Sequence, residues 1–208
     1  MAVLRKSAEY PARLEIDYPE RLSRLTTLFR MIWAIPIWVV MIVVSGAIPS
    51  NVMAGIPLAG GGVLFAGPLL MILFRQKYPS WWFDWNLEFT RLSTRVQAYF
   101  LLLTDQYPST DEVQSVHLVL DYPDVEQDLN RWLPLVKWVL LIPHYLVLVV
   151  LGFIAVFAVI IAWFAILFTG VYPRWIFDFV VGSGRWALRA YAYGFLLITD
   201  KYPPFSLK

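Results

Sequence analysis

The sequence predicts a mainly α-helical integral membrane protein with four transmembrane helices, arranged as two hairpin repeats of the same orientation. Three observations predict this fold class: an apolar and aromatic composition, two long stretches without formal charge, and a set of motifs that occurs twice in the same order. After each hairpin we expect an amphipathic interfacial helix that carries aromatic and arginine side chains. A short cytoplasmic β-ribbon completes the expected architecture.

The composition excludes several classes of protein. Hydrophobic residues make up 59% of the 208 residues and charged residues 15%, whereas soluble domains are about 45–50% apolar and roughly 25% charged. The aromatic content of 17% argues against disorder. The absence of cysteine excludes disulfides, thiolate zinc sites and cysteine-ligated iron–sulfur clusters. A net charge of +2 provides no basic footprint for nucleic acid.

Membrane spans are expected in the two uncharged stretches. Residues 31–74 are 44 residues without Asp, Glu, Lys or Arg, and residues 138–173 are 36 such residues. Because a span needs about 20 apolar residues, the first stretch holds two crossings and an outer turn at 46–62. The second holds two only if Leu133–Val136 join the first crossing and the chain turns near Gly152. One helix over the whole second stretch would be about 54 Å long, too long for a core of about 30 Å; a re-entrant half-hairpin is the alternative.

The basic residues predict the orientation. All 17 Lys and Arg residues lie outside the two uncharged stretches. If each stretch is a hairpin, the N-terminal, central and C-terminal segments share one side of the membrane, which the positive-inside rule assigns to the cytoplasm. We therefore expect both termini in the cytoplasm. The basic residues among the first 30 leave no apolar core for a secretory signal peptide.

Motifs of the first half recur in the second half, which predicts an internal duplication. The recurring motifs are Asp-Tyr-Pro at 17–19 and 121–123, Ile-Pro at 35–36 and 142–143, Tyr-Pro at 78–79 and 172–173, and Thr-Asp-x-Tyr-Pro at 104–108 and 199–203. The expected units are residues 1–110 and 111–208, of which the first is longer because of its outer turn. Since each unit has two spans, their pseudo-two-fold axis is expected along the membrane normal.

Each unit opens with a short alternating run. Period two over this length is typical of a strand with one apolar face. The two strands are expected to pair across the pseudo-axis, on a supporting surface, because an isolated ribbon is marginally stable in water. The alternating residues are Leu14, Ile16 and Tyr18, and then Val116, Leu118, Leu120 and Tyr122.

Amphipathic helices are expected at Ser80–Leu103 and Arg174–Ile198, each directly after a proline, which is tolerated at a helix start. Acidic and arginine side chains fall on one stripe of each helix at helical spacing, while the remaining surface is largely apolar and aromatic. The stripe residues are Asp84, Glu88, Arg91 and Arg95 in the first copy, and Asp178, Arg185 and Arg189 in the second.

Three interpretations of the stripes are open. A narrow charged stripe on a Trp-rich helix is typical of a helix that lies in the membrane interface, which implies anchoring without a site. Alternatively, the stripes of the two copies face each other and bind an anionic lipid or a partner's carboxylate, since guanidinium groups suit both. A third interpretation places the arginines on a transport path through the membrane.

The sequence offers no catalytic, cofactor-binding or metal-binding constellation. It lacks a Ser/His/Asp set, a zincin motif and a phosphate loop, and the glycines at 60–62 have no following lysine. His144 lies in the second uncharged stretch, and His117 lies in an expected strand, which is a poor basis for a metal site. The expected role of His144 is a structural hydrogen bond to a carbonyl freed by Pro143; a proton-linked group or a ligand is the alternative.

The second copy resembles a bacterial membrane family catalogued as domain of unknown function 4389. The resemblance rests on Ile-Pro-His-Tyr at 142–145, Phe-Thr-Gly-x-Tyr-Pro-Arg-x-x-Phe-Asp-Phe at 168–179, Arg-Trp-x-x-Arg-x-x-x-Tyr at 185–193 and Thr-Asp-x-Tyr-Pro-Pro-Phe at 199–205. The first copy is looser, with Arg75-Gln76-Lys77 in place of Thr-Gly-x and Ile37 in place of the histidine. The resemblance implies a small multi-span protein of the bacterial inner membrane, here with two tandem copies, and it implies no activity.

The leading functional hypothesis is a non-catalytic accessory or scaffold subunit of a larger membrane complex. Its expected partners are membrane lipids and other membrane-protein subunits or further copies of itself, with no nucleic acid, cofactor or metal. The alternative is a small transporter or channel built around the pseudo-axis, although the hairpins lack the ionisable groups that transport paths usually carry. A lipid-modifying enzyme that uses Asp84 or Asp178 is a third hypothesis.

Overall fold

The computed structural model of the protein describes residues 10–45 and 63–208. The described chain is mainly helical with one two-stranded sheet, which confirms the mainly α class. The elements are β1 (Ala12–Ile16), α1 (Arg24–Trp33), α2 (Ile35–Ser45), α3 (Val63–Arg75), α4 (Ser80–Phe100), β2 (Val116–Leu120), α5 (Val125–Asp128), the 3₁₀ helix η2 (Leu133–Leu135), α6 (Lys137–Leu140), α7 (Ile142–Thr169) and α8 (Arg174–Gly194).

The expected ribbon is present. Strands β1 and β2 pair antiparallel with Leu14 opposite Leu118. Even-numbered side chains of both strands point to the interior and odd-numbered ones to the surface, as period two requires. The backbone N–H of Asp17 donates to the carbonyl of Ser115. In an antiparallel pair, hydrogen-bonded and non-hydrogen-bonded pairs alternate, so the carbonyls of Leu14 and Leu118 point outward from the two edges of the ribbon.

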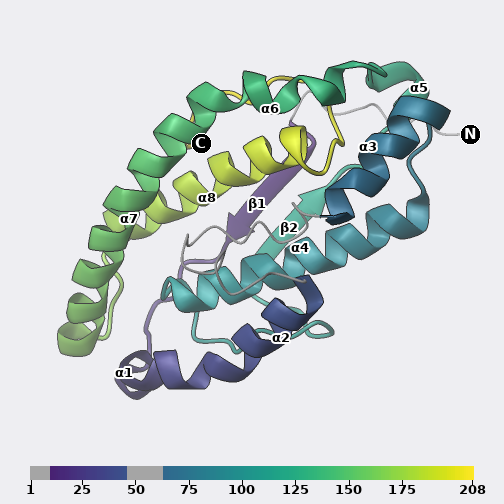
Figure 1. Ribbon diagram of the computed structural model, residues 1–208. Coiled ribbons are helices and arrows are strands. Elements are labelled where there is room, and N and C mark those ends of the chain that lie inside the picture. Colours follow the sequence, from purple (N-terminus) through teal and green to yellow (C-terminus); the bar gives the residue numbers. More distant parts are fainter. Residues whose placement is uncertain (1–9, 46–62) are drawn as a thin grey trace, which may run out of the picture.

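The ribbon lies between the two long amphipathic helices. Helix α8 packs on β1, α4 packs on β2, and α7 runs along α8 on the side away from the ribbon (Figure 1). The main hydrophobic core joins the buried face of the ribbon to α4, α8 and one stripe of α7. The two helices therefore supply the surface that a two-stranded ribbon needs to be stable.

Residues 142–169 form one continuous helix, α7, so the predicted turn near Gly152 is wrong, and so is the re-entrant alternative. A glycine in a helix costs about 1 kcal/mol relative to alanine, too little to end a helix in which no proline follows Pro143. A backbone in apolar surroundings is also best satisfied by intrahelical hydrogen bonds. The helix is shorter than the uncharged stretch because it begins only at Ile142 and ends at Thr169, where Gly170 caps it with a left-handed φ of 76°.

Two segments of the described chain, rather than four, are long and apolar enough to cross a membrane: Arg24–Val43 and Ile142–Thr169. The first comprises α1 and most of α2, and the predicted outer turn at 46–62 lies outside the described residues. Length and composition favour membrane association. Because α7 does not turn back, its ends lie about 42 Å apart. The prediction that the central and C-terminal segments share one side of the membrane assumed a hairpin at this position, and it therefore loses its basis.

The amphipathic helices start where predicted and end earlier. Helices α4 and α8 have 21 residues each and follow Pro79 and Pro173. They end before Leu103 and Ile198 because Leu102 and Leu197 adopt φ values of 66° and 56°. The left-handed conformation is costly for leucine. Both side chains are buried in the main core, and the burial of their apolar surface offsets the cost of this conformation.

Candidate functional site

Two of the predicted stripe arginines hold the edges of the ribbon. The Nε of Arg185 on α8 donates to the carbonyl of Leu14 at 2.8 Å, and the Nε of Arg91 on α4 donates to the carbonyl of Leu118 at 3.3 Å. These are the outward carbonyls of one cross-strand pair. The ribbon therefore separates the two stripes, and the arginines approach the same pair from opposite edges. Each satisfies a backbone acceptor that an unprotected edge would leave unpaired.

The other two arginines fasten the segments that follow their helices. Arg95 Nη1 donates to the carbonyl of Ser109 at 2.5 Å. Arg189 Nη1 donates to the carbonyl of Lys208 at 2.7 Å, and its Nη2 donates to that of Ser206. Burial lowers the pKa of Arg189, and the two carbonyls partly replace the water that its guanidinium has lost. All four stripe arginines thus donate to backbone carbonyls of the chain itself.

The acidic stripe residues lie at the surface. Glu88 Oε1 lies 2.5 Å from Arg91 Nη1, and Asp178 Oδ1 lies 3.2 Å from Arg174 Nε, each pair within one helix. Such exposed pairs stabilise a helix by about 0.2–0.5 kcal/mol. Asp84 is exposed and has no hydrogen bond or ion pair with a described residue. The predicted contact with an anionic lipid or a partner stays a prediction for all seven stripe residues.

His144 is buried at the start of α7. Its Nδ1 accepts a hydrogen bond from Trp186 Nε1 at 2.8 Å, and its ring stacks on Phe205 with centroids 4.0 Å apart. An accepting Nδ1 places the proton of neutral imidazole on Nε2. The partner is an indole on α8 instead of the predicted carbonyl near Pro143, so His144 links α7 to α8 and to the C-terminal segment.

A buried lysine that the sequence analysis did not single out lies at the start of α6. The side chain of Lys137 is 0% exposed. Its Nζ lies 2.7 Å from Asp200 Oδ1, donates to the carbonyl of Thr199 at 2.8 Å, and lies 4.8 Å from the ring centroid of Tyr193. Burial lowers the pKa of Lys137, and the hydrogen bond and charge of Asp200 oppose that shift.

A second buried cation has the same surroundings in the first half. Arg30, 2% exposed, pairs with Asp105, and its Nη1 donates to the carbonyls of Tyr99 and Thr104 at 2.7 and 2.9 Å. Its guanidinium lies 4.5 Å from the ring centroid of Tyr99. One signal in the sequence marks both cations. Arg30 and Lys137 each stand five residues before an Ile-Pro, and their partners stand in the two Thr-Asp-x-Tyr-Pro motifs.

The recurring Tyr-Pro pairs bond across the two halves of the chain. The hydroxyl of Tyr18 donates to the carbonyl of Tyr172 at 2.5 Å, and that of Tyr122 donates to the carbonyl of Tyr78. The hydroxyl of Tyr78 in turn donates to the carbonyl of Leu196 at 3.0 Å. Burial raises the pKa of Tyr78 and of Tyr172. These tyrosines tie each half to the other through backbone acceptors.

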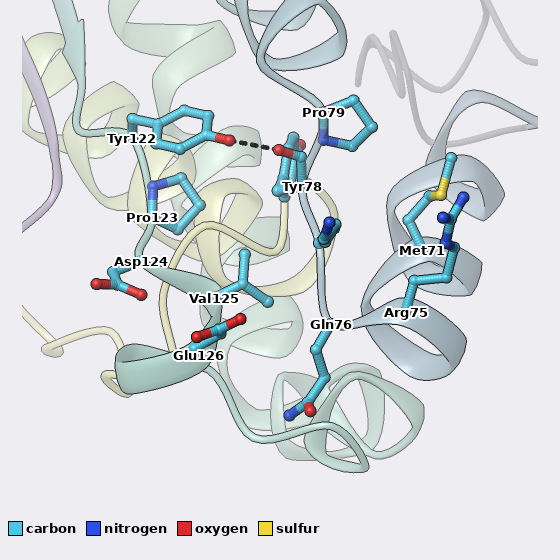
Figure 2. Close-up of a pocket in the computed structure, with 11 residues that line it drawn as sticks. Met71, Arg75, Gln76, Tyr78, Pro79, Tyr122, Pro123, Asp124, Val125 and Glu126 are labelled. Atoms are coloured by element: carbon cyan, nitrogen blue, oxygen red, sulfur yellow. Dashed lines mark hydrogen bonds between the residues drawn. The ribbon is translucent and has the colours of Figure 1, made fainter.

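A cavity of about 590 Å³ opens beside one of these Tyr-Pro pairs. Figure 2 shows it between the end of α3 and residues 122–126, with Gln76–Pro79 between them. Arg75, Lys77, Asp124 and Glu126 supply charges of both signs. No residue of the predicted stripes lines it, and neither does His144. The sequence feature that marks this cavity is Arg75-Gln76-Lys77, which stands where the second copy has Thr-Gly-x.

Comparison with known proteins gives one match. Residues 132–206 match the model of DUF4389, a domain of unknown function. The segment that matches this model begins before α6 and includes Lys137, His144, Arg185, Arg189 and Asp200. No curated protein and no solved structure matches the chain. In residues 10–45 and 63–208, no three His, Asp or Glu side chains gather in a way that could hold a metal ion.

Proposed function

We propose that this protein is a non-catalytic integral membrane protein of the bacterial inner membrane. It serves there as an accessory or scaffold subunit that contacts lipid and the helices of partner subunits. The arrangement of α7 carries the proposal, and the use of charged side chains within the protein supports it.

Helix α7 exposes most of its apolar surface. Its buried residues after His144 are Ala158, Ala162 and Ile166, spaced by four and therefore on one stripe that faces the core. The remaining faces carry exposed large side chains such as Phe153, Phe157 and Phe164. A soluble monomer rarely exposes a contiguous apolar patch above a few hundred Å². Lipid tails or partner helices are the surroundings in which this helix is stable.

The arginines of the predicted stripes and the two buried cations argue for a structural role over a catalytic one. The four stripe arginines donate to backbone carbonyls, and the buried cations Arg30 and Lys137 are paired with aspartates. A catalytic group needs access to a substrate and a perturbed acid or base poised toward it. The paired and buried groups lack that access.

We further propose that the chain consists of two tandem copies of one unit, of which the DUF4389 segment is the second. Reciprocal contacts support this proposal. Arg91 and Arg185 bond the strand of the other copy, as Tyr18 and Tyr122 bond the Tyr-Pro of the other copy. The paired cations, Arg30 and Lys137, repeat within the copies. An axis between Leu14 and Leu118 relates these contacts.

The test is photo-crosslinking of the full chain in native membranes. A photoreactive residue at Phe157, which is 53% exposed on α7, is compared with one at Val113, which is 93% exposed in the α4–β2 segment. The proposal expects the probe at Phe157 to label lipid or one membrane protein in fixed stoichiometry, and the probe at Val113 to label no lipid.

Two results would overturn the proposal. Release of the protein from membranes by alkaline carbonate would refute integration. Solute flux through proteoliposomes that contain only this chain would favour the transporter alternative.

A further inference from the structure

The cavity beside Tyr78 and Tyr122 has the size and the charges of a ligand site. Its volume of about 590 Å³ falls within the range of small-molecule pockets, roughly 300–1,000 Å³. Apolar side chains such as Met71 and Val125 line it together with charged ones. Figure 2 shows Met71 and Arg75 on the α3 side and Val125 and Glu126 on the opposite side.

Three charged groups of this cavity have no partner among the described residues. Arg75, Lys77 and Glu126 are exposed, and none of their side chains forms an ion pair or a hydrogen bond with a described residue. Asp124, by contrast, is occupied as the N-cap of α5, where Oδ1 accepts from the N–H of Gln127 at 3.3 Å. Within the described part of the chain, the cavity therefore offers two unpaired cations and one unpaired carboxylate, whereas the stripe arginines are occupied.

The cavity arises where the two halves differ in sequence. Arg75 and Lys77 stand where the second half has Thr169 and Val171 before its Tyr-Pro. The segment between the Pro of Asp-Tyr-Pro and the next buried leucine is longer in the second half, and α5 lies within it. Both differences meet at this one cavity. A purely structural turn would not require charged side chains that lack a partner among residues 10–45 and 63–208.

The cavity also lies where an apolar helix becomes polar. The last turns of α3 expose Leu70 and Phe74, and α3 ends at Arg75. Trp81, at the start of α4, is exposed beside the same segment. Exposed tryptophan and a terminal arginine are typical of headgroup depth. This position depends on the proposed function, in which the apolar surface lies in lipid.

We propose that the cavity binds the headgroup of a zwitterionic phospholipid that carries a primary ammonium, such as phosphatidylethanolamine. The phosphate pairs with Arg75 and Lys77, the ammonium pairs with Glu126, and the first acyl carbons lie against Met71 and Val125. The phosphate of a headgroup with net negative charge would also pair with Arg75 and Lys77, but such a headgroup has no ammonium to pair with Glu126. A choline headgroup cannot donate a hydrogen bond to Glu126.

The test uses the full chain in nanodiscs with equal parts of phosphatidylethanolamine, phosphatidylcholine and phosphatidylglycerol, followed by native mass spectrometry of the retained lipids. The wild type is expected to retain the ethanolamine lipid about tenfold over the other two, since a hydrogen bond to a charged group is worth that factor. Glu126→Gln is expected to abolish the preference over the choline lipid. The double variant Arg75→Gln, Lys77→Gln is expected to lose all three lipids. Arg21→Gln, in the corresponding segment of the first half, is the matched control and should change nothing.

The outcomes separate this inference from the proposed function. A membrane-integrated wild type without ethanolamine preference overturns the inference and leaves the proposed function standing. A chain that does not integrate into the nanodisc overturns the proposed function. An equal loss of preference in Arg21→Gln refutes the assignment of the binding residues. Displacement of the lipid by glycerophosphoethanolamine at equal concentration refutes the lipid as the source of the headgroup.

Discussion

Replacing Lys137 by methionine should strongly destabilise the protein. Removal of one partner from a buried ion pair costs about 3–5 kcal/mol, because the other charge stays buried without compensation. Lys137 is 0% exposed and pairs with Asp200, whose side chain is 19% exposed and still accepts from the N–H of Asn130 at 2.5 Å. This solvent exposure and this hydrogen bond still stabilise part of the Asp200 charge after Lys137 is replaced. We therefore expect a loss of about 3 kcal/mol for Lys137→Met, at the lower end of that range.

The assay is reversible unfolding in mixed micelles, with the free energy of unfolding measured for Lys137→Met, Asp200→Asn and the double variant. Lys201→Met is the control, because Lys201 is exposed one residue after Asp200. The double variant should be more stable than the sum of the single losses by about 2 kcal/mol, since it leaves no unpaired charge. A loss below about 1 kcal/mol for Lys137→Met, or strict additivity, would refute the assigned role.

Three further predictions follow from other contacts. Burial raises the pKa of Tyr78 above its ordinary value of 10.0, so the folded chain keeps a proton that the unfolded chain releases, and its stabilisation is lost as the pH rises above that value. Tyr78→Phe should cost about 1 kcal/mol near neutral pH and reduce the alkaline loss of unfolding free energy by about 1.4 kcal/mol per pH unit; an unchanged slope would refute this. Arg185→Lys removes the guanidinium from Leu14 and should speed amide exchange of β1, whereas Arg174→Lys, in an exposed pair, should not. A Cβ on Gly182 would lie 2.6 Å from the carbonyl oxygen of Leu207, so Gly182→Ala should destabilise by about 1–3 kcal/mol. Gly184→Ala, whose Cβ would meet a side chain at 3.6 Å, should be neutral or stabilising when both variants are unfolded in mixed micelles.

The elements that were predicted well are those whose signal is local. Alternation over five residues marked β1 and β2, and Pro79 and Pro173 marked the starts of α4 and α8. The ends predicted for these two helices were wrong by a few residues, because the left-handed turn at Leu102 depends on burial of the side chain and not on the residue type. Local patterns thus predicted which elements exist better than where they stop.

The turn in the second uncharged stretch was predicted from length alone, and it was wrong. The estimate assumed that all of 138–173 belongs to one helix or to two. In the structure, Leu141 separates α6 from α7, and Gly170 ends α7 early, so 28 residues remain. Hydropathy cannot locate such breaks, because it does not distinguish a leucine within a helix from one between two helices.

The candidate site depended on partners far away in sequence. The spacing of Arg91 and Arg185 correctly placed each on its helix, but their acceptors, Leu118 and Leu14, belong to strands that are 27 and 171 residues away. Lys137 was counted only among the basic residues outside the uncharged stretches, because no local pattern indicates that it is buried. Only the fold brings these groups to their carbonyls.

The central claim is that the exposed faces of α7 lie in lipid. The chain contains no cysteine, so a single introduced cysteine carries a spin label at a unique position. Labels at Phe153, Phe157 and Phe164 in proteoliposomes should be accessible to oxygen and shielded from a water-soluble nickel complex, with the reverse at Val113. Nickel accessibility along α7 equal to that at Val113 would contradict the account.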